Sequence, residues 1–239
     1  MWYELSPSFI KILVTTMKKL SVIVVAFLAL TSFCSLSAHA QGLRLGVKAG
    51  ANLSNLSGNL TNEDRFQNKI GFHGGLLLNA GLVGDGFLSI QPELLYSQKG
   101  FKNKDKEYSL LGNTLKFTGK TNYNYLDLPI LLKINAGGLF FEAGPQFSYL
   151  LNVKDDSKRY VNGQQTSYTS SERDLNNVNR FEVGYAAGLG FQADSGPMIG
   201  IRYNGAFTDF SKDGYQNNDL RNARNQVFQA YVGFLIPSK

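Results

Sequence analysis

The stretch Asn122-Tyr-Asn-Tyr-Leu-Asp-Leu-Pro-Ile-Leu-Leu-Lys-Ile-Asn135 alternates between apolar and polar positions over most of its length. One side carries Leu126, Leu128, Ile130, Leu132 and Ile134. The other side includes Asp127 and Lys133. Because successive side chains of a β-strand point to opposite faces, the stretch predicts a strand with one apolar face and one polar face. It is also long enough to cross a bilayer when tilted.

Seven further stretches alternate in the same way, which makes eight candidate strands in all. They are Gly42–Asn52, Lys69–Leu82, Phe87–Ser97, Leu139–Val153, Arg180–Gln192, Met198–Phe207 and Gln226–Ile236. Three of the links between them are short and glycine-containing, at residues 83–86, 136–138 and 193–197. The other four are long and polar, at Leu53–Asn68, Gln98–Thr121, Lys154–Asn179 and Thr208–Asn225.

Short turns on one side and long loops on the other are typical of a closed barrel in an outer membrane. We therefore expect an all-β fold, an eight-stranded antiparallel up-and-down transmembrane β-barrel over residues 41–239. An even number of strands places both ends of the barrel on the periplasmic side. The four long loops are then expected outside the cell.

A soluble β-sandwich also alternates, so the distribution of charges and aromatic residues matters. The polar faces hold mostly Gly, Ser, Gln and Asn, whereas charge gathers in the long links. Aromatic residues on the apolar face cluster at the two ends of the strands, as in the interfacial girdles of membrane barrels. The expected girdles comprise Phe72, Tyr96, Tyr149, Phe181, Phe207 and Phe228 near the long loops, and Phe141, Phe191 and Phe234 near the short turns. The alternative is that these rings form the core of a soluble sandwich.

An eight-stranded barrel is just wide enough for side chains to fill its interior. The inward-facing positions include a set of charged and titratable residues: Arg44, Lys48, His73, Glu93, Asp127, Lys133, Glu142, Glu182 and Arg202. Since an unpaired buried charge is very costly, we expect a paired lumen charge network. If Gly137-Gly138 is a two-residue turn, Lys133 lies opposite Glu142 and the two are expected to form an ion pair. A filled lumen argues against a wide water channel.

The front of the chain has the three parts of a secretory signal peptide. Met17-Lys18-Lys19 precedes an apolar run of about a dozen residues, and Ala38-His-Ala40 forms an A-x-A-like exit. We expect a helical signal peptide over residues 17–40 and export to the outer membrane of a Gram-negative cell envelope. Residues 1–16 then look like an extension upstream of the true start. The alternative is an unusually long leader that begins at Met1.

Two stretches resemble a known family of outer-membrane proteins. Tyr125-Leu-Asp-Leu-Pro-Ile-Leu-Leu-Lys133 resembles the most recognisable part of the outer-membrane β-barrel ("porin family") domain abundant in Bacteroidota. Phe141-Glu-Ala-Gly-Pro-Gln-Phe-Ser-Tyr149 is similar to the strand that follows it in that family. The resemblance implies a small eight-stranded outer-membrane barrel, usually without an assigned activity. Such chains usually end on an aromatic residue, but here Phe234 is followed by five more residues.

The residues of the expected mature chain narrow its possible chemistry. It has one histidine, His73, and no cysteine, so we expect no catalytic site, metal site or cofactor. Residues 41–239 contain 21 basic and 17 acidic side chains without a dense basic stripe, so we expect no nucleic-acid partner. The expected partners are outer-membrane lipid and lipopolysaccharide, the outer-membrane assembly machinery, and an unknown extracellular molecule that contacts the loops.

Three functions remain open at this point. The first is a structural or surface-interaction role through the long loops, without catalysis. The second is a small passive pore whose conductance depends on Lys48, Glu93, Asp127 and Arg202. The third is a lipid-modifying enzyme, in which His73 acts with a serine and an acid on the barrel surface.

Overall fold

The computed structural model describes residues 43–58, 65–83, 86–110, 112–176, 178–210 and 222–237. The expected signal peptide at 17–40 and the extension at 1–16 lie outside the described residues. Parts of the first and fourth long links also lie outside them. No helix among the described residues is both long and apolar enough to cross a membrane.

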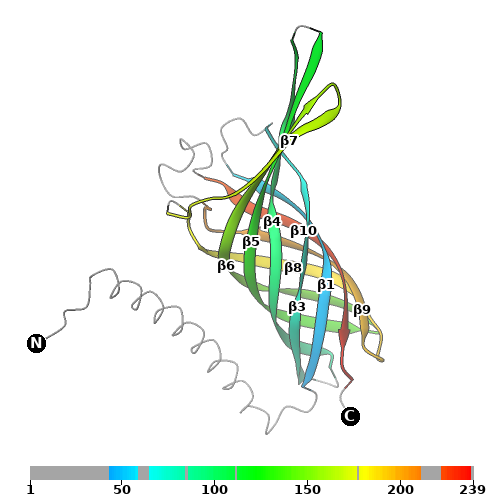
Figure 1. Ribbon diagram of the computed structural model, residues 1–239. Helices are drawn as coiled ribbons and strands as arrows, with labels where there is room; N and C mark the ends of the chain where they lie inside the picture. Colours follow the sequence, from blue (N-terminus) through cyan, green and yellow to red (C-terminus); the bar gives the residue numbers. More distant parts are fainter. Residues whose placement is uncertain are drawn as a thin grey trace, which may run out of the picture. The chain divides into compact units, whose positions relative to one another are not determined.

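Within the described residues the chain forms ten strands, all paired antiparallel. They are β1 (Arg44–Ser57), β2 (Phe66–Gln67), β3 (Lys69–Val83), β4 (Leu88–Leu110), β5 (Asn113–Ala136), β6 (Leu139–Val161), β7 (Gln164–Glu172), β8 (Phe181–Gln192), β9 (Pro197–Ala206) and β10 (Arg224–Leu235). Eight of them follow one another in the order β4-β3-β1-β10-β9-β8-β6-β5, and β5 pairs with β4 to close the ring. The eight-stranded barrel is therefore confirmed (Figure 1).

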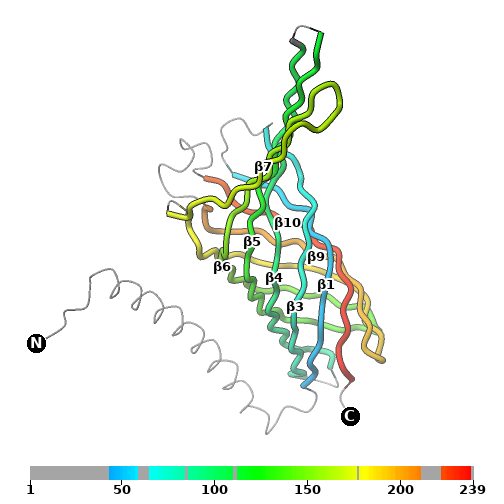
Figure 2. Tube along the Cα trace, viewed as in Figure 1, coloured from blue at the N-terminus to red at the C-terminus, as the bar shows by residue number. Residues whose placement is uncertain are grey.

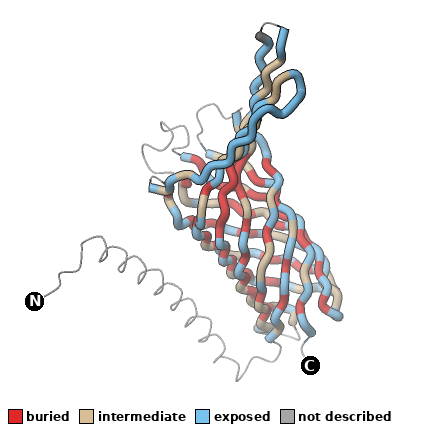
Figure 3. Tube along the Cα trace, in the orientation of Figure 1, coloured by how far each residue is buried: buried red, intermediate tan, exposed pale blue. Residues whose placement is uncertain are grey.

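The walls of the barrel alternate between buried and exposed residues, as the sequence predicts. On β1, Val47 is exposed and Lys48 is buried. On β4, Leu94 is exposed and Glu93 is buried. Figure 3 shows this alternation along the strands of the barrel wall. The polar face of each strand therefore points into the lumen, and the apolar face forms the outer wall.

Two of the four long links are not loops, and here the sequence-based prediction is wrong. Most of Gln98–Thr121 belongs to β4 and β5, and Lys154–Asn179 supplies the end of β6 and all of β7. These extensions continue the sheet beyond the barrel (Figures 1 and 2). We call residues 102–120 and 154–173 the blade. Its strands are exposed on both faces, so they lack the apolar alternation by which the barrel strands were recognised.

The tip of the β6–β7 hairpin carries a specific turn signal. Val161 pairs with Gln164, and the two residues between them, Asn162 and Gly163, have φ values of 49° and 81°. Positive φ at both central positions is the geometry of a type I′ turn, for which Asn-Gly is a preferred dipeptide. This dipeptide therefore sets the pairing next to the turn, and the register of the β6–β7 hairpin shifts farther along, between Arg159 and Tyr160. The first and last strands of the ring are paired with each other, and Gly46 of β1 pairs with Leu235 of β10 at the end of this ladder.

Candidate functional site

The centre of the lumen is held together by Arg202 of β9. Its guanidinium donates two hydrogen bonds to Glu93 of β4, at 2.8 and 2.9 Å, and approaches Oε1 of Glu142 of β6 to 2.7 Å. In the ring, β9 and β4 are four strands apart and so lie on opposite walls. The Arg202–Glu93 pair therefore crosses the full width of the barrel.

Two further side chains complete this central cluster. Lys48 of β1 lies 3.3 Å from Glu93, and its Nζ sits 3.5 Å from the ring centroid of Tyr231. The Tyr231 hydroxyl donates a 2.7 Å hydrogen bond to Glu142. Two cations thus face two carboxylates that are shielded from solvent. Charged side chains can be buried in this way when they are paired and form additional hydrogen bonds.

A second ionic cluster lies nearer the blade and centres on Lys99 of β4. Its Nζ lies 3.0 Å from Asp127 and 3.2 Å from Glu182. The predicted strand ends at Ser97, so the predicted lumen residues do not include Lys99. Lys99 lies an even number of residues from Glu93, so a strand two residues longer predicts its inward position.

The predicted Lys133–Glu142 ion pair is wrong, although the predicted register is confirmed. The two residues are paired across the β5–β6 hairpin. The Nζ of Lys133, however, donates a 2.6 Å hydrogen bond to Gln192, whereas Glu142 binds Arg202. The register supports the predicted inward position of Arg44, which is paired with the buried Asn79. Arg44 nevertheless lies half-exposed at the rim, where its guanidinium donates to the backbone carbonyls of Leu235 and Ile236, and among the described residues it forms no ion pair of the lumen network.

His73 lies inside the lumen and not on the lipid-facing surface. Its Nδ1 is 2.7 Å from Oδ1 of Asn52, and the amide of Gln229 donates to the same oxygen at 3.0 Å. The Asn52 amide in turn donates to Ser97. His73 therefore belongs to a network of amides, and no carboxylate is hydrogen-bonded to it among the described residues.

Apolar clusters close the lumen above and below the charged clusters. Near the blade, nine buried residues pack together: Leu56, Phe101, Tyr123, Tyr125, Leu150, Val153, Val178, Phe210 and Ala223. Val178 and Phe210 come from the links that follow β7 and β9, and both side chains pack into this cluster. At the other end, Leu77, Phe140, Met198, Tyr231 and Leu235 form a smaller cluster.

The residues assigned to the aromatic girdles all lie exposed on the outer wall. These are Phe72, Tyr96, Phe141, Tyr149, Phe181, Phe191, Phe207, Phe228 and Phe234. Phe72 contacts Tyr96 at 5.7 Å between ring centroids, and Phe181, Phe207 and Phe228 each contact an aromatic ring outside this set. Arg180 lies over the ring of Tyr149 at 4.9 Å.

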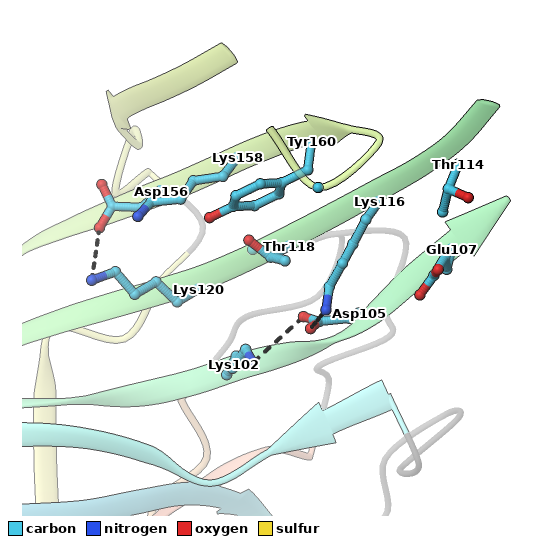
Figure 4. A pocket seen from close by; sticks show the side chains of 12 residues that line it. Lys102, Asp105, Glu107, Thr114, Lys116, Thr118, Lys120, Asp156, Lys158 and Tyr160 are labelled. Atoms are coloured by element: carbon cyan, nitrogen blue, oxygen red, sulfur yellow. Dashed lines mark ion pairs between the residues drawn. The ribbon is translucent and has the colours of Figure 1, made fainter. Parts of the chain in front are cut away.

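The blade carries the excess positive charge of residues 41–239. It contains nine Lys and Arg residues and five Asp and Glu residues, whereas the rest of residues 41–239 has twelve of each. One of its faces holds a groove of about 590 Å³. Figure 4 shows that β4, β5 and β6 all contribute to it, with Lys116 and Lys120 on β5 and Lys158 on β6.

Acidic side chains hold part of this groove in place. Asp105 lies 3.4 Å from Lys102 and 3.1 Å from Lys116, and Asp156 lies 3.5 Å from Lys120 (Figure 4). Burial on its own raises the pKa of Asp105. The hydrogen bond from Lys116 and the charges of both lysines outweigh this effect, so the pKa of the Asp105 carboxyl lies below its usual range. The same ion pair raises the pKa of Lys116.

The family model described as "Outer membrane protein beta-barrel domain" matches residues 37–212. The chain belongs to this family. It is therefore an outer-membrane β-barrel protein, and the predicted location is confirmed. No curated protein matches the chain.

Solved outer-membrane barrels similar to this family member include Ail of Yersinia pestis, crystallised with the heparin analogue sucrose octasulfate. That match has 13% identity, a TM-score of 0.38, and covers 82% of this chain and 99% of Ail. Neisserial surface protein A matches with 15% identity and a TM-score of 0.34, over 80% of this chain and 96% of its own. CarO of Acinetobacter baumannii matches with 13% identity and a TM-score of 0.35, over 78% and 96%.

Proposed function

We propose that this protein is a non-catalytic surface-interaction protein of the outer membrane, in which the blade makes the contacts with its partner. The observation that carries the proposal is that the excess positive charge lies on a sheet extending beyond the barrel. A charged, solvent-exposed sheet attracts partners of opposite charge and speeds their association. An anionic macromolecule outside the cell is therefore the expected class of partner.

The interior of the barrel supports a binding role over a pore. Arg202 bridges opposite walls, and apolar clusters lie on both sides of the ionic clusters. We expect the purified mature chain to show no steady ion conductance in planar bilayers. A reproducible conductance that changes in Arg202→Met would support the passive pore and contradict this part of the proposal.

Retention of whole cells on coated surfaces tests the binding role. Cells that display the chain are compared with cells that display a shortened blade, in which residues 104–118 and 157–169 are each replaced by Asn-Gly. The surfaces carry polyglutamate, dextran sulfate or neutral dextran. We expect retention on an anionic surface that requires the full blade, and none on neutral dextran. Equal retention of both kinds of cell on all three surfaces would overturn the proposed function.

As a control, the full chain and the chain with the shortened blade must form comparable barrels. Both should reach the outer membrane in similar amounts and show heat-modifiable mobility in gels, because the replaced residues lie outside the ring.

A further inference from the structure

The blade has two faces, which continue the two sides of the barrel wall. On β5, Tyr123 and Thr121 are buried on the lumen side. Leu115 and Phe117 lie at even spacings from them along the same strand, so they share that side, which we call the inner face of the blade. The groove that includes Lys116 lies on the opposite, outer face (Figure 4).

The residues of the inner face form rows across three strands. Because directly paired residues of antiparallel strands point to the same side, the register defines each row. The row nearest the hairpin tips comprises Tyr108, Leu115 and Val161. The next row comprises Lys106, Phe117 and Arg159, and the third comprises Asn103, Gly119 and Ser157. At intervals of about 7 Å along β5, the inner face therefore changes from apolar side chains to an aromatic ring between two cations, and then to small or polar residues.

The first two rows carry an exposed patch in the free protein. Tyr108 and Phe117 are exposed to solvent, with 6.3 Å between their ring centroids. Lys106 and Arg159, on either side of Phe117, are exposed as well. Exposed apolar patches that are rimmed by polar residues mark sites that bind proteins or membranes. We call the six residues of these two rows the tip patch.

The charges of the blade are divided unequally between its faces. Four of its five acidic side chains lie on the outer face, namely Asp105, Glu107, Asp156 and Glu172. The fifth, Asp155, lies on the inner face but away from the tips, where it accepts a hydrogen bond from Arg173. Among the described residues, Lys106 and Arg159 form no ion pair. The tip patch therefore combines apolar side chains with cations and contains no acidic residue.

We propose that the tip patch binds the surface of a second, anionic phospholipid bilayer, separate from the one that the barrel spans. Aromatic rings favour the interface between the acyl chains and the headgroups of a bilayer, and cations beside them attract anionic headgroups. The order of the rows fits this environment: the apolar row lies deepest, the cations lie at headgroup depth, and the third row stays in water. The spacing of the first two rows is comparable to the depth of about 5–10 Å to which interfacial segments enter a bilayer. A soluble protein partner gives no reason for this order.

The tip patch does not face the lipid around the barrel. It continues the lumen side of β5, whereas the opposite side of this strand forms the outer wall. The blade also extends beyond the barrel (Figures 1 and 2). The bilayer in question therefore belongs to another cell or to a vesicle. This inference goes beyond the proposed anionic macromolecule, because it gives the blade a lipid surface as a further partner.

A single tryptophan tests the site, because residues 41–239 contain none. Tyr108→Trp places the probe on the inner face, and Ser109→Trp places it on the outer face. Each variant is held in a nanodisc of ordinary lipid and mixed with vesicles of phosphatidylcholine and phosphatidylserine that have brominated acyl chains, so that only the second bilayer quenches the probe. We expect quenching and a blue shift for Tyr108→Trp, and neither for Ser109→Trp. Equal quenching of both probes, or of neither, would overturn the proposal.

Removal of aromatic rings from each face provides a second test. Tyr108→Ser with Phe117→Ser should weaken binding to these vesicles by about tenfold or more, because burial of the two rings drives insertion. Tyr160→Ser with Tyr168→Ser removes two rings from the outer face and should leave binding almost unchanged. All four residues lie outside the ring, so both variants should keep heat-modifiable gel mobility. Equal losses in the two variants would contradict the tip patch.

Removal of cations from each face tests the role of charge. Lys106→Gln with Arg159→Gln should weaken binding by about tenfold or more. Lys154→Gln with Lys158→Gln makes the same change of net charge on the outer face and should have a smaller effect. Equal losses in both variants would show that only net charge matters and would contradict the site. Equal binding of the unaltered blade to vesicles of phosphatidylcholine alone would also contradict it.

The outcomes separate this inference from the proposed function. If retention on polyglutamate or dextran sulfate requires the blade but the second bilayer does not quench Tyr108→Trp, only the lipid site is wrong. If that probe alone is quenched and neither anionic coating retains the cells, the lipid site stands and the proposed anionic macromolecule is wrong.

Discussion

At the scale of single residues, Arg202 binds two carboxylates that have few other cationic partners. Without its guanidinium, Glu93 keeps Lys48, and Glu142 keeps the hydroxyl of Tyr231. Removing one member of a buried ionic network leaves charge uncompensated and typically costs about 3–5 kcal/mol. We therefore expect Arg202→Met to lower the free energy of unfolding by about this amount, measured by urea titration in lipid vesicles.

A second substitution, which removes the carboxylate charge that Arg202→Met leaves unpaired, provides the control. Combining Arg202→Met with Glu142→Gln should recover part of the lost stability, because the amide carries no charge and can still accept from Tyr231. If Arg202→Met lowers the free energy of unfolding by less than about 1 kcal/mol, water or rearranged side chains stabilise the two carboxylates. That result would contradict a central cluster from which water is excluded.

For single residues of the lumen, the sequence could predict which positions are buried but not which ion pairs they form. Parity alone predicts the buried positions of Glu93, Asp127 and Arg202, because each lies within a strongly alternating stretch. The ionic partner of each residue could not be predicted in this way. Lys133 faces Glu142 across a hairpin, yet Arg202 reaches that carboxylate from another strand. Such contacts depend on the tilt and stagger of the strands, and the alternation of apolar and polar residues does not predict either of them.

At the scale of elements, the blade depends on ion pairs that acid removes. Because the folded-state pKa of Asp105 lies below its ordinary value of 3.8, its ion pairs stabilise the hairpin above that pH. Their contribution is lost as the pH falls through the lower, folded-state pKa. The pKa of Asp156 also lies below its usual range: burial raises it, but hydrogen bonds from Ser170, Tyr168 and Asn122 and the charge of Lys120 outweigh this effect.

We therefore expect the blade to open more readily at about pH 3 than at about pH 6. Hydrogen-exchange rates corrected for the intrinsic effect of pH measure this opening, with amides of the ring strands as internal reference. Asp105→Asn should make the β4–β5 tip open equally at both pH values. Unchanged acid sensitivity in that variant would show that Asp105 does not hold the tip.

The strands of the blade could not be predicted from the sequence. Apolar alternation predicts strands only where one face meets lipid, and both faces of the blade meet water. The sequence therefore predicts loops where the structure has the strands of the blade. The local signal for one hairpin was the dipeptide Asn162-Gly163, whose positive φ values fit a two-residue turn. The charges of β4 are compatible with a strand edge as well as with a loop, so composition could not separate the two.

At the scale of the whole molecule, the closed ring could be predicted because eight alternating stretches leave no edge when the first and last strands pair. The same reasoning predicts an outer wall that meets lipid. Ile201, between the two aromatic belts, and Phe207, within one of them, are almost equally exposed, at 58% and 60%. In water, arginine at either position should cost a similar, small amount. In a membrane the cost depends on depth.

We expect Ile201→Arg to lower the free energy of unfolding in lipid vesicles by about 2–4 kcal/mol, and Phe207→Arg to lower it by about 0–1 kcal/mol. Both variants add the same charge to the outer wall, so each serves as the control for the other. Repeating the urea titrations in vesicles with shorter acyl chains should narrow the difference, because a thinner bilayer brings Ile201 nearer to its surface. Equal costs at the two positions would show that solvent, and not lipid, surrounds this wall.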